Sequence, residues 1–364
     1  MWETYRNADK VLVLDSCMLQ ESVCESEPLQ LLMSIRISGW MRRLWTYHEA
    51  CLAREIYYQF LDGALKDNNL IHKIITAQIE DEDHMSPHGH AYTRLDENTD
   101  LRLILADSII YPAWKWLNEQ CQLESDIDSE ARLSQILMPL CWRWTSWKSD
   151  EAICLSNLLN LPLEKRIEIV ESEPSVRMKV LFTILERVPL TILFADRERY
   201  KGEGYGWIPT SLLGGGRSAT MLSTLTATVT KAGLKLSRPG IILSGHITTI
   251  CNNEGIYARD AEGCRFVTIM TQSKDPFDVS KLNSSRTAII LREPMKYPDH
   301  ISGSMGALVT VSQTGDGNCE HENGQLVVQY HNVVKVYSGD EAHGYETPNI
   351  IFEQLKESQN WLVR

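Results

Sequence analysis

One glutamate follows tryptophan and arginine residues at a spacing that could form a binding or catalytic site. Glu49 follows Trp45 by four residues, about one helical turn, and follows Arg42 and Arg43 by about two turns. On a helix this glutamate is placed to pair with one of these arginines or with Arg54, which would contribute on the order of a few tenths of a kcal/mol. Either arginine of the 42–43 pair can also hold a phosphate through two N–H donors. We therefore take Glu49 and its neighbours as the first candidate site.

Histidines contribute to two further candidate sites. His48 adjoins Glu49, but consecutive residues on a helix point about 100° apart, so the two should not share a face. A second cluster lies in residues 81–90 and combines carboxylates with imidazoles: Asp81, Glu82, Asp83, His84, His88 and His90. Two histidines four residues apart would share one helix face, as a zinc site needs, but Pro87 and Gly89 break such a helix. We interpret this segment as an exposed polar loop rather than a metal site.

The sequence contains ten tryptophans but only six phenylalanines. Five indoles gather in the middle of the chain, at Trp114, Trp116, Trp142, Trp144 and Trp147. They can line an apolar ligand pocket, but we favour a core of large residues between packed helices. Trp40 and Trp45 are likewise interpreted as core anchors rather than as a stacking platform.

The elements that must position Glu49 begin with residues 10–15, Lys-Val-Leu-Val-Leu-Asp. This short apolar run predicts a strand buried on both faces, as in a parallel α/β sheet. A parallel strand needs a parallel partner and a crossover helix. The partner is expected at residues 56–60, after a helical stretch over residues 30–54. Glu49 then lies near the end of the crossover.

The rest of the chain divides into a helical and a β-rich part. From residue 65 to about residue 186 the apolar spacing is helical, and Ser149 with two acidic residues after it predicts a helix N-terminus there. Beyond Gly202, short β-rich runs are separated by turn residues, at 241–250, 265–271, 287–291, 307–312 and 326–337. The expected fold is mixed α+β, with an α/β unit over 1–64, a helical region over 65–213 and an antiparallel β barrel or sandwich over 214–364.

Composition limits the classes of function. Hydrophobic residues make up 43% and charged residues 23% of the 364, as in ordinary globular proteins, and this excludes a fibrous repeat or a coiled coil. The net charge of −12, without a long basic run, argues against nucleic acid and anionic membranes as partners. No apolar run is long enough for a membrane span, and the first residues lack a signal-peptide core. Nine scattered cysteines without a C-x-x-C pair predict buried free thiols in a reducing compartment, so we expect a cytoplasmic protein.

Two segments carry a family resemblance. Residues 8–15, Ala-Asp-Lys-Val-Leu-Val-Leu-Asp, and residues 38–50, Ser-Gly-Trp-Met-Arg-Arg-Leu-Trp-Thr-Tyr-His-Glu-Ala, resemble the later part of the fungal heterokaryon-incompatibility (HET) domain. That family shows a buried strand followed by a helix bearing Trp, Arg, Trp and Glu. Further segments also look like fungal chains that carry this domain, at 59–63, 143–146, 150–155, 177–178 and 206–209. The resemblance extends over residues 1 to about 213.

The resemblance implies a TIR-like, flavodoxin-like α/β unit and a role in fungal non-self recognition and cell-death signalling. In the related TIR domains the matching glutamate supports cleavage of NAD, so Glu49 is the implied catalytic residue. A fixed carboxylate can stabilise the oxocarbenium-like charge that builds on the ribose when the nicotinamide bond breaks. The implied cofactor-binding residues are Trp45, Arg42, Arg43 and Ser38.

The sequence also departs from the family. HET domains begin with further strands and a W-I-D-x-x-C-I-N-Q-like motif, and neither is found here, so we expect the N-terminal part of the domain to be lacking. The leading hypothesis is therefore a HET-type signalling protein that is degenerate in catalysis, requires no cofactor and works through protein partners, including self-association. One alternative is a glycohydrolase that cleaves NAD with Glu49. Another is a repurposed fold that binds or transforms an apolar small molecule in the Trp-rich region.

Overall fold

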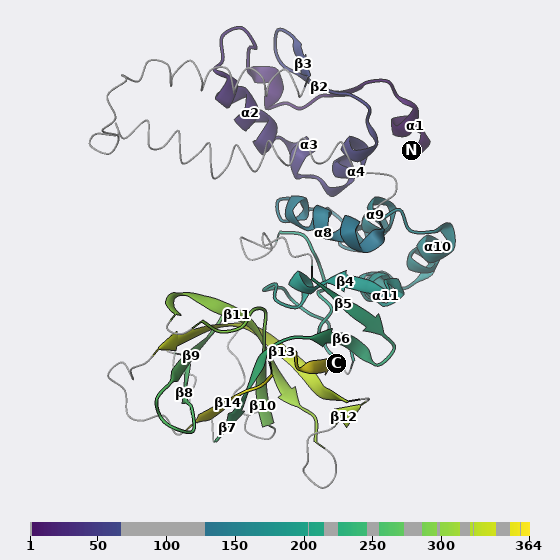
Figure 1. Ribbon diagram of the computed structural model, residues 1–364. Coiled ribbons are helices and arrows are strands. Elements are labelled where there is room, and N and C mark those ends of the chain that lie inside the picture. Colours follow the sequence, from purple (N-terminus) through teal and green to yellow (C-terminus); the bar gives the residue numbers. More distant parts are fainter. Residues whose placement is uncertain are drawn as a thin grey trace, which may run out of the picture. The chain divides into compact units, whose positions relative to one another are not determined.

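The computed structural model divides the chain into two compact units (Figure 1). One comprises Met1–Ile127 with Trp142–Trp147, and the other Asp128–Cys141 with Lys148–Arg364. The structure describes residues 2–66, 128–202, 204–214, 225–245, 255–272, 286–296, 299–313, 321–322, 324–339, 350–356 and 358–364. The described helices after residue 128 belong to the same unit as the β-rich part, whereas the sequence predicts a boundary between 213 and 214.

The first unit contains a three-stranded sheet in the order β1-β2-β3. Strand β1 (Val11–Val13) runs parallel to β2 (Ile56–Gln59), with Val11 opposite Ile56, and β2 runs antiparallel to β3 (Ala64–Lys66). The parallel pair and its helical crossover confirm the expectation from the sequence. The helices of this unit are α1 (Trp2–Asn7), η1 (Met18–Gln20), α2 (Pro28–Ile37), α3 (Gly39–Arg42) and α4 (Leu44–Leu52).

The crossover is three short helices rather than one because two residues interrupt it. Ser38 and Arg43 have extended backbone, with ψ of 150° and 141°. Asp15, just after β1, fixes the start of α3, since its Oδ2 accepts a hydrogen bond from the Trp40 backbone N–H at 3.0 Å. Its Oδ1 accepts one from the Cys17 N–H at 3.1 Å. The acidic residue just after the first strand therefore orients the helices that follow it.

Burial of β1 differs from the expectation. Val13 is 2% exposed, whereas Leu12 and Leu14 are 51% and 64% exposed. The prediction of burial on both faces is therefore wrong. The core of this unit lies on the other face, where the Trp40 indole meets the Tyr58 ring edge-on with centroids 5.9 Å apart. Trp40 is a core anchor, as expected.

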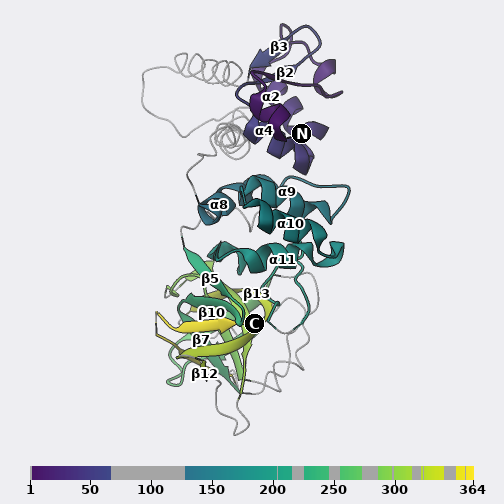
Figure 2. The same ribbon diagram turned by 90° about the vertical axis from the view of Figure 1, so that its right-hand side faces the viewer.

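The second unit begins with helices that pack on one another (Figure 2). Figure 2 shows α9, α10 and α11 side by side, and all three pairs are in contact. Their buried faces include Leu155, Ile169 and Phe182, and the Phe182 ring meets the Trp207 indole edge-on. The elements are α8 (Ser129–Leu140), α9 (Asp150–Leu158), α10 (Leu163–Glu171), η3 (Pro174–Val176), α11 (Arg177–Ile184), β4 (Arg187–Pro189) and η4 (Leu190–Ile192).

Seven of the described strands close into a barrel in the order β11-β10-β7-β14-β8-β9-β13, and β13 pairs back onto β11. The interior is filled by aliphatic side chains such as Ile241, Ile289 and Val334. A barrel was one of the two predicted architectures and is confirmed. Its strands are β7 (Gly240–Ser244), β8 (Ile256–Arg259), β9 (Phe266–Thr271), β10 (Arg286–Leu291), β11 (Asp299–Val311), β13 (Gln325–Gly339) and β14 (Ile351–Gln354).

The long strand β13 also extends the sheet beyond the barrel. It pairs in parallel with β15 (Asn360–Val363), and β6 (Gly233–Ser237), β5 (Thr226–Thr230) and β4 follow in order, while β12 (His321–Glu322) pairs with β13 elsewhere. Trp361 of β15 is fully buried and donates from Nε1 to the Arg238 carbonyl at 2.9 Å. A Cβ on Gly240 would lie 2.5 Å from the Trp361 ring, so glycine is required at this contact.

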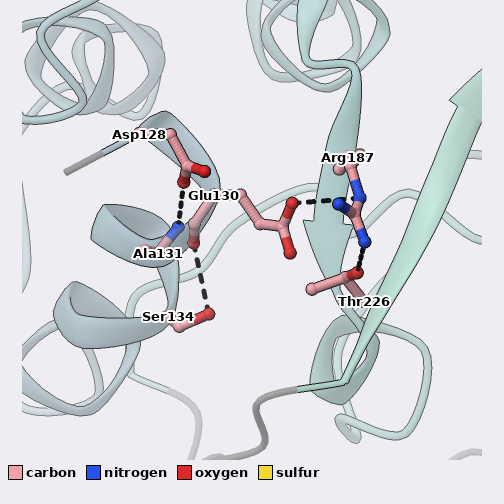
Figure 3. Close-up of polar contacts among 6 residues, drawn as sticks. All are labelled: Asp128, Glu130, Ala131, Ser134, Arg187 and Thr226. Carbon is pink, nitrogen blue, oxygen red and sulfur yellow. Dashed lines mark hydrogen bonds and ion pairs between the residues drawn. The ribbon is translucent and has the colours of Figure 1, made fainter.

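The helical part and the strands of this unit are joined by hydrogen-bonded pairing and by a polar bridge. Strand β4 pairs antiparallel with β5, with Val188 opposite Ala227. Figure 3 shows Arg187 between Glu130 of α8 and Thr226 of β5. The Arg187 Nε lies 3.2 Å from the Glu130 Oε2, and the guanidinium also donates to the Thr226 hydroxyl. These contacts explain why α8 shares a unit with the strands.

Within the described part of the chain, no helix combines the length and the apolar character that a membrane crossing needs.

Candidate functional site

Glu49 lies on α4, near the end of the crossover that leads into β2. Its side chain is half-buried and accepts a hydrogen bond from the Tyr5 hydroxyl of α1. Burial raises the pKa of this carboxyl above its ordinary value, while the Tyr5 hydrogen bond and the positive charge of Arg43 oppose that rise. The pKa of Tyr5 is also raised, by burial and by the negative charge of Glu49. The pair can therefore hold or release a proton closer to neutral pH than an exposed glutamate can.

The other residues of the predicted site differ in accessibility. Trp45 is 37% exposed rather than a core anchor, and Arg42 and Arg43 are exposed. Ser38 is fully buried, where its Oγ donates to the Ile35 carbonyl at 2.7 Å and accepts from the Met41 N–H at 3.1 Å. Its hydroxyl thus joins α2 to α3. A cofactor-binding role for Ser38, Arg42, Arg43 and Trp45 stays a prediction.

A buried arginine that was not among the predicted site residues holds α4 in place. Arg143 is 1% exposed, and its guanidinium lies over the Tyr47 ring, 4.6 Å from the ring centroid. Its Nη1 donates to the Arg43 carbonyl at 2.7 Å and contacts the Thr46 Oγ1 at 3.4 Å. Arg143 belongs to the resemblance segment at 143–146, so its place in that motif was the available signal.

Backbone pairing supports the same contact. The Trp144 N–H donates to the Arg42 carbonyl at 2.8 Å, and the Leu44 N–H donates to the Trp144 carbonyl at 2.9 Å. Residues 42–44 and 143–144 therefore lie side by side although about 100 residues separate them. Two segments that carry the family resemblance are brought together at the start of the Glu49 helix.

The tryptophans of the middle region do not form the expected core. Trp142, Trp144 and Trp147 are 52%, 48% and 71% exposed, so the interpretation of these three indoles as core residues is wrong. The Arg36 guanidinium lies over the Trp142 ring, 4.6 Å from its centroid. Trp114 and Trp116 fall outside the residues that the structure describes, as does the cluster over 81–90.

The described histidine and cysteine side chains add little to the candidate site. His48 is buried beside the half-exposed Glu49. Among the described residues, no group of three or more His, Cys, Asp or Glu side chains is placed to hold a metal ion. The prediction of buried thiols is confirmed for Cys141 and Cys154 but is wrong for Cys17, Cys24 and Cys264, which are exposed.

A glutamate of the second unit is buried. Glu151 lies in the first turn of α9, as predicted, but its burial was not foreseen, and it is 1% exposed. Its Oε2 accepts from the Ser211 hydroxyl at 2.7 Å and its Oε1 from the Leu212 N–H at 2.6 Å. Burial raises its pKa in spite of these hydrogen bonds. The available signal was its position four residues before Leu155, on the apolar stripe of the helix.

The helix N-terminus predicted at Ser149 is confirmed. Ser149 occupies the N-cap position of α9, although its side chain makes no capping hydrogen bond there.

A cleft of about 480 Å³ opens beside Ser211 in this unit. Its wall is formed by the starts of α9 and α11 and by the segment from Asp196 to Gly214, and Glu49 is not among its lining residues. The charged side chains on the wall are Lys148, Arg177, Asp196, Arg197 and Glu198. Arg177 lies in one of the segments that carry the family resemblance, but no sequence pattern indicated this cleft.

Comparisons with known proteins give no match: no family model, no curated protein and no solved structure resembles this chain closely enough to be assigned.

Proposed function

We propose that this chain is a HET-type signalling protein of fungal non-self recognition, located in the cytoplasm and acting through protein partners, with a degenerate NAD-cleaving site. The single observation that supports it best is the junction of residues 42–44 with residues 143–144. Both segments resemble parts of HET-domain chains, and nothing in their separate sequences requires them to meet. Their contact brings two segments that carry the resemblance next to each other at the start of α4.

The surroundings of the predicted site favour a scaffold over a catalyst. The Ser38 hydroxyl makes hydrogen bonds to the backbone on both sides of the α2–α3 junction. The Glu49 carboxylate is hydrogen-bonded by Tyr5, and the Arg42 carbonyl by Trp144. These polar groups already have partners within the fold, and leaving buried polar groups unpaired costs about 1–3 kcal/mol each. The same groups instead stabilise the helices around Glu49.

A cell-based experiment tests the signalling role. The full chain is induced in a filamentous fungus, and viability is followed with a vital dye. We expect induction to reduce viability, the variant Glu49→Gln to act like the wild type, and Arg143→Ala to lose the effect because it removes the clamp on α4. Arg54→Ala, which breaks only an exposed ion pair with Asp9, is the matched control. Unchanged viability with soluble wild-type protein would contradict the proposal.

NAD cleavage by Glu49 is the second candidate, favoured by the half-buried carboxyl and its raised pKa. Purified protein is incubated with NAD and free nicotinamide is measured by chromatography. We expect no release above background, with Glu49→Gln behaving identically. Release that is lost in Glu49→Gln and retained in Glu55→Gln, a carboxylate paired with Lys66 in the same unit, would establish the glycohydrolase instead.

A further inference from the structure

The cleft beside Ser211 is lined by charged side chains of both signs. Lys148 and Arg177 stand at the starts of α9 and α11, together with the hydroxyl-bearing Ser149 and Ser175. Asp196 and Glu198, with Arg197 between them, come from a later segment that lines the same cleft. At about 480 Å³ the cleft falls in the range of small-molecule sites, about 300–1,000 Å³. Cationic and anionic side chains together suit a polar ligand that carries both charge and hydroxyl groups.

The Arg177 side chain is fixed by neutral backbone groups. Its guanidinium donates to the carbonyls of Val170 at 2.9 Å, of Ser172 at 3.4 Å and of Ser149 at 3.4 Å. Carbonyl acceptors orient a guanidinium without cancelling its charge, so the positive charge of Arg177 is retained at the cleft. Arg197 donates to the Leu213 carbonyl at 3.0 Å, but the negative charge of the nearby Glu151 partly offsets its own charge.

The segment that carries Asp196 and Glu198 is held by backbone hydrogen bonds. The Thr210 N–H donates to the Glu198 carbonyl at 2.8 Å, and the Tyr200 N–H donates to the Ile208 carbonyl at 3.1 Å. The Tyr200 hydroxyl then donates to the Ser175 carbonyl at 3.0 Å, which ties this segment to the residues just before α11. The two parts of the cleft lining are therefore fixed to each other, and a preformed site loses less entropy on binding.

We propose that this cleft binds a small phosphorylated sugar, with the phosphate at Lys148 and Arg177 and the sugar hydroxyls at Asp196 and Glu198. Cationic side chains and serine hydroxyls are the ordinary donors to phosphate. Carboxylates accept hydrogen bonds from sugar hydroxyls, which a plain anion lacks. The cationic side chains of the lining disfavour a divalent cation, and an apolar ligand would desolvate the charged groups without replacing their hydrogen bonds to water. The site is independent of Glu49, which lies in the other unit.

Calorimetric titration of the full chain tests the proposal with ribose 5-phosphate as the probe. We expect measurable binding of ribose 5-phosphate, and weaker binding of ribose or inorganic phosphate alone. Lys148→Gln should weaken ribose 5-phosphate about tenfold, the usual effect of losing one charge-assisted contact. Because Lys148 is exposed, this variant should fold, and a thermal melt checks that it does. Lys231→Gln, in the turn between β5 and β6, is the matched control and should bind like the wild type.

A second variant tests the contacts to the sugar. Glu198→Ala should weaken ribose 5-phosphate about fivefold and leave inorganic phosphate unaffected, because only the sugar hydroxyls lose a partner. Absence of ribose 5-phosphate binding at millimolar concentration would overturn the proposal. So would binding that is unchanged in both Lys148→Gln and Arg177→Lys, or inorganic phosphate binding as tightly as the sugar phosphate. None of these outcomes bears on viability or on nicotinamide release, so this site and the proposed function can fail separately.

Discussion

Two glutamates, one in each unit, have a pKa raised by burial but differ in what holds them. Glu49 is half-buried on α4, and its hydrogen-bond donor is a side chain, the Tyr5 hydroxyl. Glu151 is 1% exposed on α9, and backbone as well as side-chain groups of residues 211–213 donate to it. The Glu49 carboxyl can titrate with little movement of the backbone, whereas the Glu151 carboxylate holds residues 211–213 in place.

This difference teaches that a raised pKa alone does not identify a functional acid. A carboxylate that accepts backbone N–H bonds is part of the fold, because its loss leaves main-chain donors without a partner. A half-exposed carboxylate that is held by one hydroxyl can gain or lose a proton without disrupting the backbone around it. The predictions below test this distinction by removing one partner at a time.

The largest effect is expected for Glu151→Ala. The substitution leaves the buried Leu212 N–H without its acceptor and removes a negative charge near Arg197. We expect the free energy of unfolding to fall by about 3 kcal/mol, in the range for breaking a buried charged network. Glu151→Gln, which keeps one acceptor oxygen, should cost about half as much. Urea unfolding followed by tryptophan fluorescence measures both.

Glu164→Ala is the control for this experiment, since Glu164 is an exposed acid in the first turn of α10. Its effect should stay within about 0.5 kcal/mol. Equal effects at positions 151 and 164 would mean that the backbone hydrogen bonds to Glu151 do not support the fold.

Much of the fold could be predicted because it follows from local patterns. The parallel pair of β1 and β2 followed from two apolar runs and a helical stretch between them. The barrel followed from β-rich runs at regular spacing, and β9, β10 and β13 lie close to their predicted positions. Strands β14 and β15 were missed because they are four residues each and depend on pairing with distant strands. Such pairing is not encoded in local periodicity.

The candidate site was predicted less well, for a different reason. Exposure of a large side chain depends on what packs against it in three dimensions. Trp40 and Trp45 look alike in the sequence, yet Trp40 is 5% and Trp45 37% exposed. The role of Glu151 depends on Ser211, about 60 residues away. A residue type and its spacing could therefore nominate Glu49 but could not find the cleft.

The second prediction concerns the partner of Glu49. Tyr5→Phe removes the hydroxyl that favours the charged carboxylate, so the pKa of Glu49 should rise further above its ordinary value of 4.5. We expect a loss of stability of about 0.5–1 kcal/mol, as for one ordinary hydrogen bond. Carbon-detected NMR titration of the Glu49 carboxyl measures the pKa. Tyr57→Phe is the matched control, because its hydroxyl donates to Glu55 and not to Glu49.

The same carboxyl makes stability depend on pH. Because its folded pKa is raised, the folded state binds a proton more tightly than the unfolded state, and the contribution to stability is fully present below pH 4.5. It is lost as pH rises from there through the folded pKa. Glu49→Gln should flatten this part of the pH profile of the unfolding free energy. An unchanged profile would show that Glu49 is as solvated in the folded chain as in the unfolded one.

The smallest effect on the free energy of unfolding is expected at a third glutamate. It tests whether the distinction between acids held by backbone groups and acids held by side chains is general. Burial raises the pKa of Glu130, and its partner is the ion pair with Arg187, a side chain that is 59% exposed. If backbone partners are what make a buried acid structural, Glu130 should behave like Glu49 and not like Glu151. A double-mutant cycle of Glu130→Ala and Arg187→Ala should then give a coupling of about 0.5 kcal/mol, weakened by salt. A coupling as large as the loss in Glu151→Ala would show instead that burial, and not the kind of partner, determines which acid supports the fold.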